Sequence, residues 1–428
     1  MNPDHLAPDV VVVGAGVGGA TVASELMSRG MSVLVIESGY DDPVPISTWP
    51  DPAAGATLPV DGSTAAGRYP VGRGPGGGTR VSGLLVSLGL VDDYAEWAGG
   101  WDGVRARFDG LKVPVDPASD AEWSPVDEAL ASRLVAFGAH RDDEWWRAGR
   151  PDSWGVARYA WSRLTRTTVW RGLARGVPLR AGAPVVRIVR DGETVSSVVL
   201  RDGSTVRANR VVLCAGAAAT PALLAASGIA VHGVAHDHPA ISVAVRPARP
   251  RRPAVHCGVS GRLSVRAPGD LLVSSWTSMD GGSGAIMAAA ATGSRGTVGS
   301  DGRPVIVLDD ANREVLDAGL RIVLGAISDG ISAGVLMDAP CDGWATSVDD
   351  LRAATKDRRR SWLVTHVQGH WHLAGTVAGT VDDHGAVRQA RGLWVADAAA
   401  LPNLPRAGPM ASVMVRATFT AEHVASNG

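Results

Sequence analysis

The segment Asp9–Glu37, DVVVVGAGVGGATVASELMSRGMSVLVIE, decides the fold. It opens with an unbroken apolar run, Val10–Val13, which is typical of a strand buried on both faces of a parallel sheet. An amphipathic helical segment follows, and then a second apolar run, Val33–Ile36. This order of strand, helix and strand predicts a complete βαβ unit.

Three glycines between the first strand and the helix form a G-x-G-x-x-G pattern. Gly14 suits the tight turn, Gly16 lets a pyrophosphate approach the backbone, and Gly19 lets the helix pack close to the strand. The helix N-terminus would face the phosphates with free N–H groups. Glu37 ends the second strand, where a carboxylate would accept hydrogen bonds from the adenosine ribose. The segment therefore predicts a bound dinucleotide.

Length and composition limit the class of protein. With 428 residues the chain is long enough for two domains, and its net charge of −2 gives no reason to expect nucleic acid or an anionic membrane surface as a partner. Three cysteines (Cys214, Cys257 and Cys341) lie far apart and form no C-x-x-C, which favours a reducing compartment. The N-terminus lacks a signal-peptide pattern and no apolar run could span a bilayer. We expect a cytoplasmic protein without a transmembrane segment.

A second glycine-rich run, Gly72–Gly83, follows a Pro- and Gly-rich excursion over Asp41–Val71. Such a run could be a flexible linker. However, it directly precedes the apolar stretch Leu84–Leu90 and carries Thr79 and Ser82 between its glycines. These features favour a loop pressed against a ligand.

The two glycine-rich loops with the intervening glutamate resemble the glucose-methanol-choline (GMC) family of FAD-dependent oxidoreductases. In that family the second loop carries the pattern G-G-S/G-S/T-x-x-N-G and lies along the flavin. The matching residues here are Gly76, Gly77, Thr79, Ser82 and Gly83. Ser82 stands where the family usually has Asn, and Val81 where some members carry a His bonded covalently to the flavin. The resemblance therefore implies non-covalent FAD.

The middle of the chain divides into two sections. Tryptophans concentrate in residues 92–180, where we expect core or lid packing, with lining of a substrate entrance as the alternative. Asp191-Gly192 and Asp202-Gly203 then sit between alternating apolar runs and predict hairpin turns. A buried strand, Val211–Leu213, follows and breaks at small residues that let a ligand approach the backbone.

The resemblance also assigns residues around this strand. It implies that Val185 contacts adenine through its backbone and that Ala215, with Ala217, contacts the dinucleotide. Asp237-His238-Pro239 matches the D-H-P with which the family closes this segment, and we interpret it as structural.

Residues 241–364 read as a second domain, in which short strands precede a helix near Arg313–Ile331. The predicted fold is an α/β FAD-binding Rossmann-type domain plus an α+β substrate domain with an antiparallel sheet. The expected division is 1–91, 181–240 and 365–428 for FAD binding, 92–180 for a lid or substrate region, and 241–364 for the substrate domain.

The chemistry is expected in the C-terminal segment. His370-Trp371-His372-Leu373-Ala374-Gly375-Thr376 matches the family's H-x-x-G-T, whose His is the base next to flavin N5, and His372 is in register. An alcohol must lose its hydroxyl proton as its carbon gives up hydride, and imidazole titrates near working pH. A satisfied core histidine is the alternative. His370 and His372 could also form an H-x-H metal pair, but no third ligand lies nearby in the sequence, so we predict no metal.

Two further segments complete the predicted site. Asp397 lies in a G-L-x-V-x-D-A pattern and is implied to sit close to the FAD backbone. A last helix, with Met410 and Ala411 in its first turn, would direct its positive dipole end at the flavin pyrimidine. The family's second His or Asn is missing at Gly408 and Pro409, so either His370 or a residue outside the motif substitutes, or the partner is absent.

We predict an FAD-dependent dehydrogenase that oxidises a CH–OH group by hydride transfer to flavin N5. The short substrate region and a W-x-x-G-W stretch resemble the mycofactocin-associated branch, whose members are thought to reoxidise a peptide-derived redox cofactor. The alternatives are a small-alcohol oxidase, a natural-product tailoring enzyme, or a flavin-binding protein with a decayed catalytic pair. We expect the electron acceptor to be a quinone or respiratory partner, not O₂, because the pocket lacks a well-placed second polar group.

Overall fold

The computed structural model describes residues 8–42, 57–60, 69–161, 167–253, 255–298, 304–338 and 347–427. Its first layer is a five-stranded sheet in which every neighbouring pair is parallel. The strand order is β22 (Leu393–Val395), β13 (Val211–Leu213), β1 (Val10–Val13), β2 (Val33–Ile36) and β9 (Leu179–Arg180). The Val- and Leu-rich strands β1, β13 and β22 are buried along their whole length, as expected for a parallel sheet covered on both faces.

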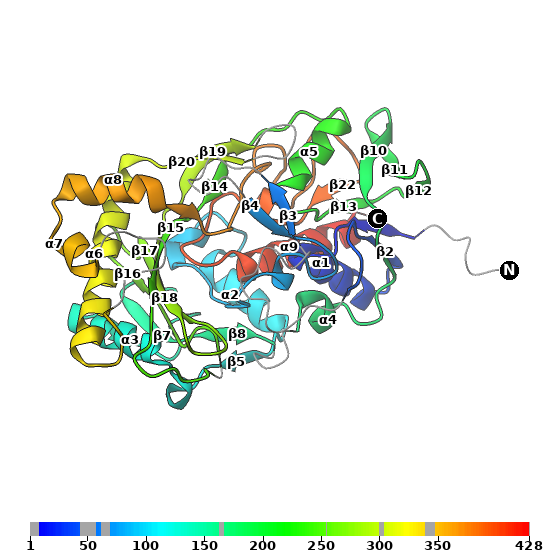
Figure 1. Cartoon of the computed structure of the whole chain (residues 1–428). Helices are drawn as coiled ribbons and strands as arrows, with labels where there is room; N and C mark the ends of the chain where they lie inside the picture. Colours follow the sequence, from blue (N-terminus) through cyan, green and yellow to red (C-terminus); the bar gives the residue numbers. More distant parts are fainter. Residues whose placement is uncertain are drawn as a thin grey trace.

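Helices from both ends of the chain pack against this sheet. Helix α1 (Val17–Ser28) lies against the C-terminal helix α9 (Met410–Ser426) in the blue and red region of Figure 1. Helix α2 (Gly100–Gly110) packs on α9, and the short helix α4 (Val169–Leu173) packs on α1. The N-terminal strands and the C-terminal helix therefore belong to one hydrophobic core.

A three-stranded antiparallel sheet flanks the parallel one. Its strands are β10 (Val185–Asp191), β11 (Thr194–Leu200) and β12 (Thr205–Arg207), and helix α5 (Ala219–Ala226) packs on β10. Both predicted hairpin turns connect these strands, so that prediction is confirmed.

The second layer is a seven-stranded sheet, antiparallel except for its last pair. Its strand order is β21 (Gln368–Gly369), β15 (Pro239–Val245), β18 (Gly284–Ala290), β17 (Leu271–Thr277), β16 (Val259–Leu263), β7 (Ser153–Val156) and β6 (His140–Arg141). Helices α3 (Pro125–Phe137) and α6 (Asp310–Ser332) pack against it, and α7 (Val348–Ala353) and α8 (Lys356–His366) pack on α6. Helices α6, α7 and α8 form the yellow and orange end of the molecule in Figure 1, and α3 is drawn in teal beside them.

Smaller elements connect the two layers. The strands are β14 (Ala235–Asp237), β19 (Ser294–Val298) and β20 (Pro304–Val307) in one sheet, β3 (Thr57–Val60) with β4 (Tyr69–Gly72), and β5 (Val115–Pro117) with β8 (Arg158–Ala160). Within the described residues, 3₁₀ turns lie at Gly77–Arg80, Val91–Tyr94, Asp120–Glu122 and Ala398–Ala400.

The predicted fold class is confirmed: a parallel Rossmann-type layer is joined to an antiparallel sheet with helices. The βαβ unit, the helix near 313–331 and the last helix occur where predicted. Strands from 92–180 enter both large sheets, and the five section boundaries stay a prediction. Most of the excursion 41–71, and Cys341, lie outside the described residues. Of the helices in the described ranges, none is long and apolar enough to cross a membrane.

The tryptophans of residues 92–180 act mainly as core. Six of them are buried and two are half-buried. The ring of Trp97 packs edge to face against Tyr94 and Phe419, and that of Trp146 against Phe108. Of these eight, only Trp145 reaches the large cavity described next.

Candidate active site

The first glycine-rich loop has the shape that its sequence predicts. Gly14 has a φ of +101°, and a Cβ added there would lie 2.3 Å from the carbonyl oxygen of Cys214. A Cβ at Gly19 would lie 1.9 Å from the carbonyl oxygen of Gly14, so the helix packs directly on the turn. By contrast, a Cβ at Gly16 would meet only the Cα of Gly77, at 3.8 Å, and Gly16 lines the cavity. Gly14 and Gly19 shape the loop, while Gly16 leaves space for a ligand.

The second glycine-rich loop docks on the first. The amide of Gly76 donates to the carbonyl of Ala15 over 2.8 Å, and a Cβ at Gly77 would lie 2.7 Å from the Cα of Gly16. Thr79 is buried, where its hydroxyl donates to the Gly76 carbonyl (2.7 Å) and accepts from the amide of Val169 at the start of α4 (3.1 Å). The two loops therefore form one glycine-lined wall.

Glu37 is engaged by the chain itself. One carboxylate oxygen accepts from the amide of Ala15 (2.9 Å), and the other accepts from the amides of Gly39 (2.8 Å) and Gly74 (3.1 Å). The carboxylate thus ties both glycine-rich loops to the end of β2 while it lines the cavity. Its predicted contact with a ribose stays a prediction.

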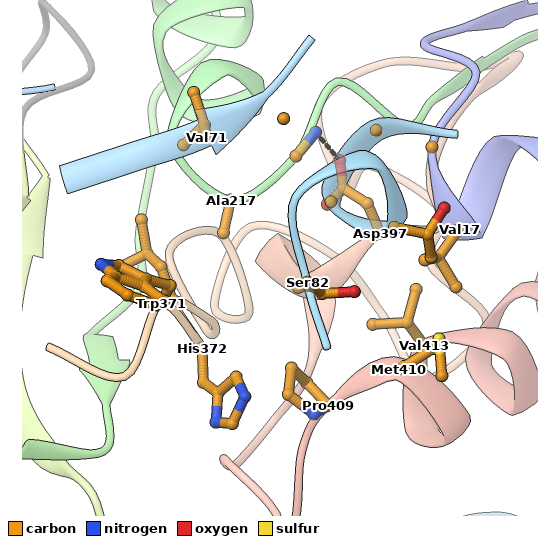
Figure 2. A pocket seen from close by; sticks show the side chains of 18 of the residues that line it. Val17, Val71, Ser82, Ala217, Trp371, His372, Asp397, Pro409, Met410 and Val413 are labelled. Atoms are coloured by element: carbon orange, nitrogen blue, oxygen red, sulfur yellow. Dashed lines mark hydrogen bonds between the residues drawn. The ribbon is translucent and has the colours of Figure 1, made fainter. Parts of the chain in front are cut away.

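Asp397 connects two crossover loops at the edge of the parallel sheet. Its carboxylate accepts from the amide of Gly216 (2.7 Å), the hydroxyl of Thr220 (2.6 Å) and the amide of Ala399 (2.8 Å). Figure 2 shows Asp397 with one of these hydrogen bonds. Burial raises the pKa of this carboxyl, and the three donors oppose that rise. Asp397 therefore shapes the site through two backbone amides and the Thr220 hydroxyl.

These loops enclose one large cavity of about 890 Å³. It runs from the first glycine-rich loop to the face of the antiparallel sheet. Most of the predicted cofactor residues line it: Gly14, Gly16, Glu37, Gly77, Thr79, Ser82, Val185, Ala215, Asp397 and Met410. Three do not line it: Gly19, which packs in the first turn of α1 against Gly14, Gly76, which packs against Thr168, and Ala411, which is buried in α9.

The cavity wall suits FAD. The glycine-lined wall leaves room at Gly16, and α1 begins there with no side chain capping its N-terminal amides. Such amides bind phosphate groups. The opposite end of the cavity lies at the N-terminus of α9, which also has no side-chain cap. The residues present therefore fit a dinucleotide that extends from α1 to α9.

Both predicted catalytic histidines line the cavity, and the structure adds a third histidine beside them. Nδ1 of His372 lies 2.9 Å from Nδ1 of His238, and the two rings meet edge to face. The ring centroids of His370 and His372 are 4.4 Å apart. Each of the three offers a ring nitrogen within 4.8 Å of the others. The expectation that no third ligand atom lies near the H-x-H pair is thus wrong, because the fold brings in His238 from 132 residues away in the chain.

The D-H-P segment holds this cluster in place. Asp237 accepts the amides of His238 (2.7 Å) and His372 (2.9 Å) through one carboxylate oxygen, and the amide of His370 donates to the carbonyl of His238 (3.0 Å). Trp371, between His370 and His372, has a φ of +61°, a conformation that bulky residues rarely adopt. The tertiary contacts therefore impose the backbone that presents His372.

Burial disfavours the protonated form of all three histidines and lowers their pKa values. It lowers the pKa of His370 to about 4 and that of His238 to about 3, with His370 adding to the effect on His238. Burial, followed by the neighbouring His370 and His238, holds the pKa of His372 well below its usual value. A neutral imidazole is the form that can accept a proton.

Gly408 faces His372 at the position where the family places its second His or Asn. A Cβ at Gly408 would lie 3.7 Å from both Cε1 and Nε2 of His372. Figure 2 shows the ring of His372 beside Pro409, with Met410 and Val413 of α9 nearby. This edge of the His372 ring is therefore beside the cavity and faces no side chain from Gly408.

The substrate end of the cavity is mostly apolar. Its wall on the antiparallel sheet includes Leu272, Trp276 and Met287, with the hydroxyls of Ser260 and Ser274 among them. The sequence did not single out these residues, because they come from three strands that carry no motif.

Comparison with known proteins agrees with this geometry. The model of the GMC oxidoreductase family matches residues 294–417. A GMC-type oxidoreductase of Rhodococcus erythropolis is 25% identical over 490 residues, covering 95% of this chain and 96% of its own. The 5-(hydroxymethyl)furfural oxidase of a Methylovorus species is 25% identical over 508 residues, covering 93% and 95%.

Solved structures share the fold along the whole chain. Pyridoxine 4-oxidase superposes with a TM-score of 0.77 at 21% identity and covers 97% of this chain and 99% of its own. Formate oxidase superposes with a TM-score of 0.81 at 15% identity and covers 98% of each. Residues 294–417 thus match the GMC oxidoreductase model, and the chain is similar along its length to GMC-type FAD-dependent oxidoreductases, in agreement with its two glycine-rich loops and a cavity that fits FAD.

Proposed function

We propose that this FAD-dependent oxidoreductase is a dehydrogenase that oxidises a CH–OH group, with His372 as the base that takes the hydroxyl proton. The observation that carries the proposal is the setting of His372. Its ring lines the cavity, is held on one nitrogen by His238, and turns its Cε1–Nε2 edge toward Gly408.

Each part of the chain has a defined task in this mechanism. The glycine-lined wall and the N-termini of α1 and α9 would hold FAD without covalent attachment, because Val81 offers no nucleophile. When bound, FAD supplies the acceptor for the hydride of the alcohol carbon. The apolar wall around Leu272, Trp276 and Met287 excludes water from the substrate.

His372 then performs the proton transfer. Its lowered pKa leaves the imidazole neutral at pH 7, so it can accept the hydroxyl proton as the alcohol is oxidised. The N-terminal dipole of α9 favours negative charge at the same end of the cavity. His370 also lines the cavity, and we assign it an auxiliary place beside His372.

Substitution of the two histidines tests the base assignment. In His372→Ala, FAD should remain bound and its anaerobic reduction by alcohol should slow by about 10²–10⁴-fold, the usual effect of a positioned acid–base group. His370→Ala should have a smaller effect. His423→Ala is a matched control, because His423 is also half-buried but lies outside the cavity wall. Loss of flavin reduction in His370→Ala with normal rates in His372→Ala would reverse the assignment.

The substrate class divides the proposal into two candidates. A mycofactocin-type redox cofactor is the first, on the resemblance of the short substrate region to that branch. A small-alcohol oxidase is the second, favoured by the relative that oxidises 5-(hydroxymethyl)furfural. An anaerobic screen for flavin bleaching with alcohols, sugars and peptide-derived redox cofactors separates these candidates. Failure of every substrate to bleach the flavin would instead support a flavin-binding protein without activity.

A further inference from the structure

The contact between His238 and His372 determines the tautomer of His372 as well as the position of its ring. Two neutral imidazole nitrogens 2.9 Å apart must share one hydrogen, with one ring donating and the other accepting. If Nδ1 of His372 donates, its Nε2 carries a lone pair. If Nδ1 of His238 donates, Nε2 of His372 carries a hydrogen and cannot act as a base. The tautomer of His372 therefore depends on His238.

The surroundings of His238 decide between these two arrangements. Its side chain is completely buried, and the carbonyls of Ala291 and Pro405 both favour the protonated ring. Within the described ranges, Nε2 of His238 has no partner that meets strict hydrogen-bond geometry. Because Nδ1 of His238 is taken up by its contact with His372, Nε2 is the ring nitrogen left to hold a hydrogen toward these carbonyl oxygens. The hydrogen of His238 thus belongs on Nε2, and its Nδ1 must accept.

We propose that His238 is the positioning residue that fixes the tautomer of His372, by accepting a hydrogen bond from its Nδ1–H and leaving Nε2 unprotonated toward the cavity. This inference rests on the proposed role of His372 as the base. It also assigns a chemical task to the D-H-P segment, whose interpretation from the sequence was structural alone.

The arrangement suits both protonation states of His372. When Nε2 takes the hydroxyl proton, the imidazolium keeps its Nδ1–H donated to the neutral Nδ1 of His238. A hydrogen bond from a charged donor is stronger than a neutral one, so this contact strengthens as the proton arrives. His238 approaches the ring from the Nδ1 side, opposite the edge next to Gly408. The chain thus supports its base from the edge away from the substrate.

The geometry favours this hydrogen bond over a metal ion shared by His238, His370 and His372. Zinc at about 2.0–2.1 Å from each nitrogen in tetrahedral geometry would set the nitrogens roughly 3.3 Å apart. The separation of the two Nδ1 atoms is 2.9 Å, which is the length of an N–H···N hydrogen bond. A metal ion would have to push the two rings apart.

Nitrogen NMR of the holoenzyme tests the tautomer directly. With ¹⁵N-labelled histidine, the His372 signals are identified by their loss in His372→Asn. We expect Nδ1 of His372 to give a protonated, pyrrole-type signal and Nε2 an unprotonated, pyridine-type signal. In His238→Phe, which has no acceptor, the two forms of His372 should mix.

Kinetics provide the second readout. The rate of anaerobic flavin reduction in His238→Phe should fall roughly 10- to 10²-fold, the loss expected for one hydrogen bond to a charged group, with KM little changed. His238→Asn can place an amide oxygen near the Nδ1 position and should recover a large part of the rate. Bound FAD and the melting temperature show that both variants fold.

Three outcomes would overturn the inference. The first is a pyrrole-type Nε2 signal for His372 in the wild type. The second is an equal loss of rate in His238→Asn and His238→Phe while the tautomer of His372 stays unchanged. The third is a stoichiometric metal ion whose removal changes the histidine spectrum. If no alcohol reduces the flavin, the proposed function fails, yet the NMR signals still decide the tautomer. The two proposals can therefore fail separately.

Discussion

Gly16 offers a test in which cofactor binding and protein stability should separate. Its φ of −78° and ψ of −160° are available to any residue. A Cβ there would meet only the Cα of Gly77, at 3.8 Å, which is ordinary van der Waals contact. Gly16→Val should therefore leave the apoprotein folded, while its branched side chain projects into the space between the two glycine-rich loops.

The expected loss of FAD affinity follows from the phosphate contacts. A bulky side chain at Gly16 would push a pyrophosphate away from the amides at the start of α1. Each hydrogen bond to a charged group contributes about 1.5–3 kcal/mol. Loss of two would weaken FAD binding by about 10²–10⁴-fold.

Titration of the apoprotein with FAD, followed by flavin fluorescence, measures this loss, and thermal unfolding of the apoprotein measures stability. Gly14→Ala is the contrasting variant, because its Cβ would lie 2.3 Å from a carbonyl oxygen at a φ of +101°. It should destabilise the apoprotein itself. Gly110→Ala, with nothing within 4 Å of its Cβ, is a neutral control. Stoichiometric, tightly bound FAD in Gly16→Val would refute the reasoning.

Four further predictions concern the flavin and the histidines. Acid precipitation should release all FAD into the supernatant because Val81 cannot form a covalent link, and flavin in the pellet would contradict this. The rate of flavin reduction should stay level through pH 6–7 and fall only in acid, because the pKa of His372 lies well below its usual value; a fall centred near pH 6.5 would show a normal histidine. The free energy of unfolding should also decline as the pH falls from about 6.5 toward 4, because His370 and His238 bind protons more weakly in the folded protein than in the unfolded chain. The decline should be up to ~1.4 kcal/mol per pH unit for each histidine, and urea unfolding measures it. Finally, the reduced enzyme should react with O₂ roughly 10²–10³-fold more slowly than an oxidase with a preorganised charge, because its histidines are neutral and Gly408 adds no polar group. Stopped-flow mixing with O₂ beside a quinone measures this, and rapid peroxide formation would favour the oxidase.

The sequence predicted the parts of the fold whose signals are local. The βαβ unit, the hairpins and the last helix depend on apolar periodicity and turn residues within short windows. The two glycine-rich loops were also readable, because a turn at φ of +101° and a helix packed at Gly19 leave no room for other residues.

The contacts between distant segments could not be predicted from the sequence. His238 meets His372 because β14 and β15 bring the D-H-P segment beside residues 368–374, and no periodicity in the chain encodes that pairing. The spacing of Glu37 from the first glycine-rich loop matches the acidic residue that binds the adenosine ribose. Its hydrogen bonds with the amides of Ala15, Gly39 and Gly74 could not be predicted, because they depend on where the fold places the second glycine-rich loop. The residues of the apolar substrate wall came from strands without any motif.

The joining of β22 and α9 to the N-terminal βαβ unit has a consequence for biosynthesis. A nascent chain that has emerged only through β13 exposes an unpaired, fully apolar edge, because Leu393–Val395 is still inside the ribosome or not yet made. The partner of α1 is later still, since α9 begins at Met410. The cofactor layer must therefore close only after β22 and α9 have been synthesised, and chains that stop before β22 should aggregate or be degraded even though their glycine-rich loops are intact.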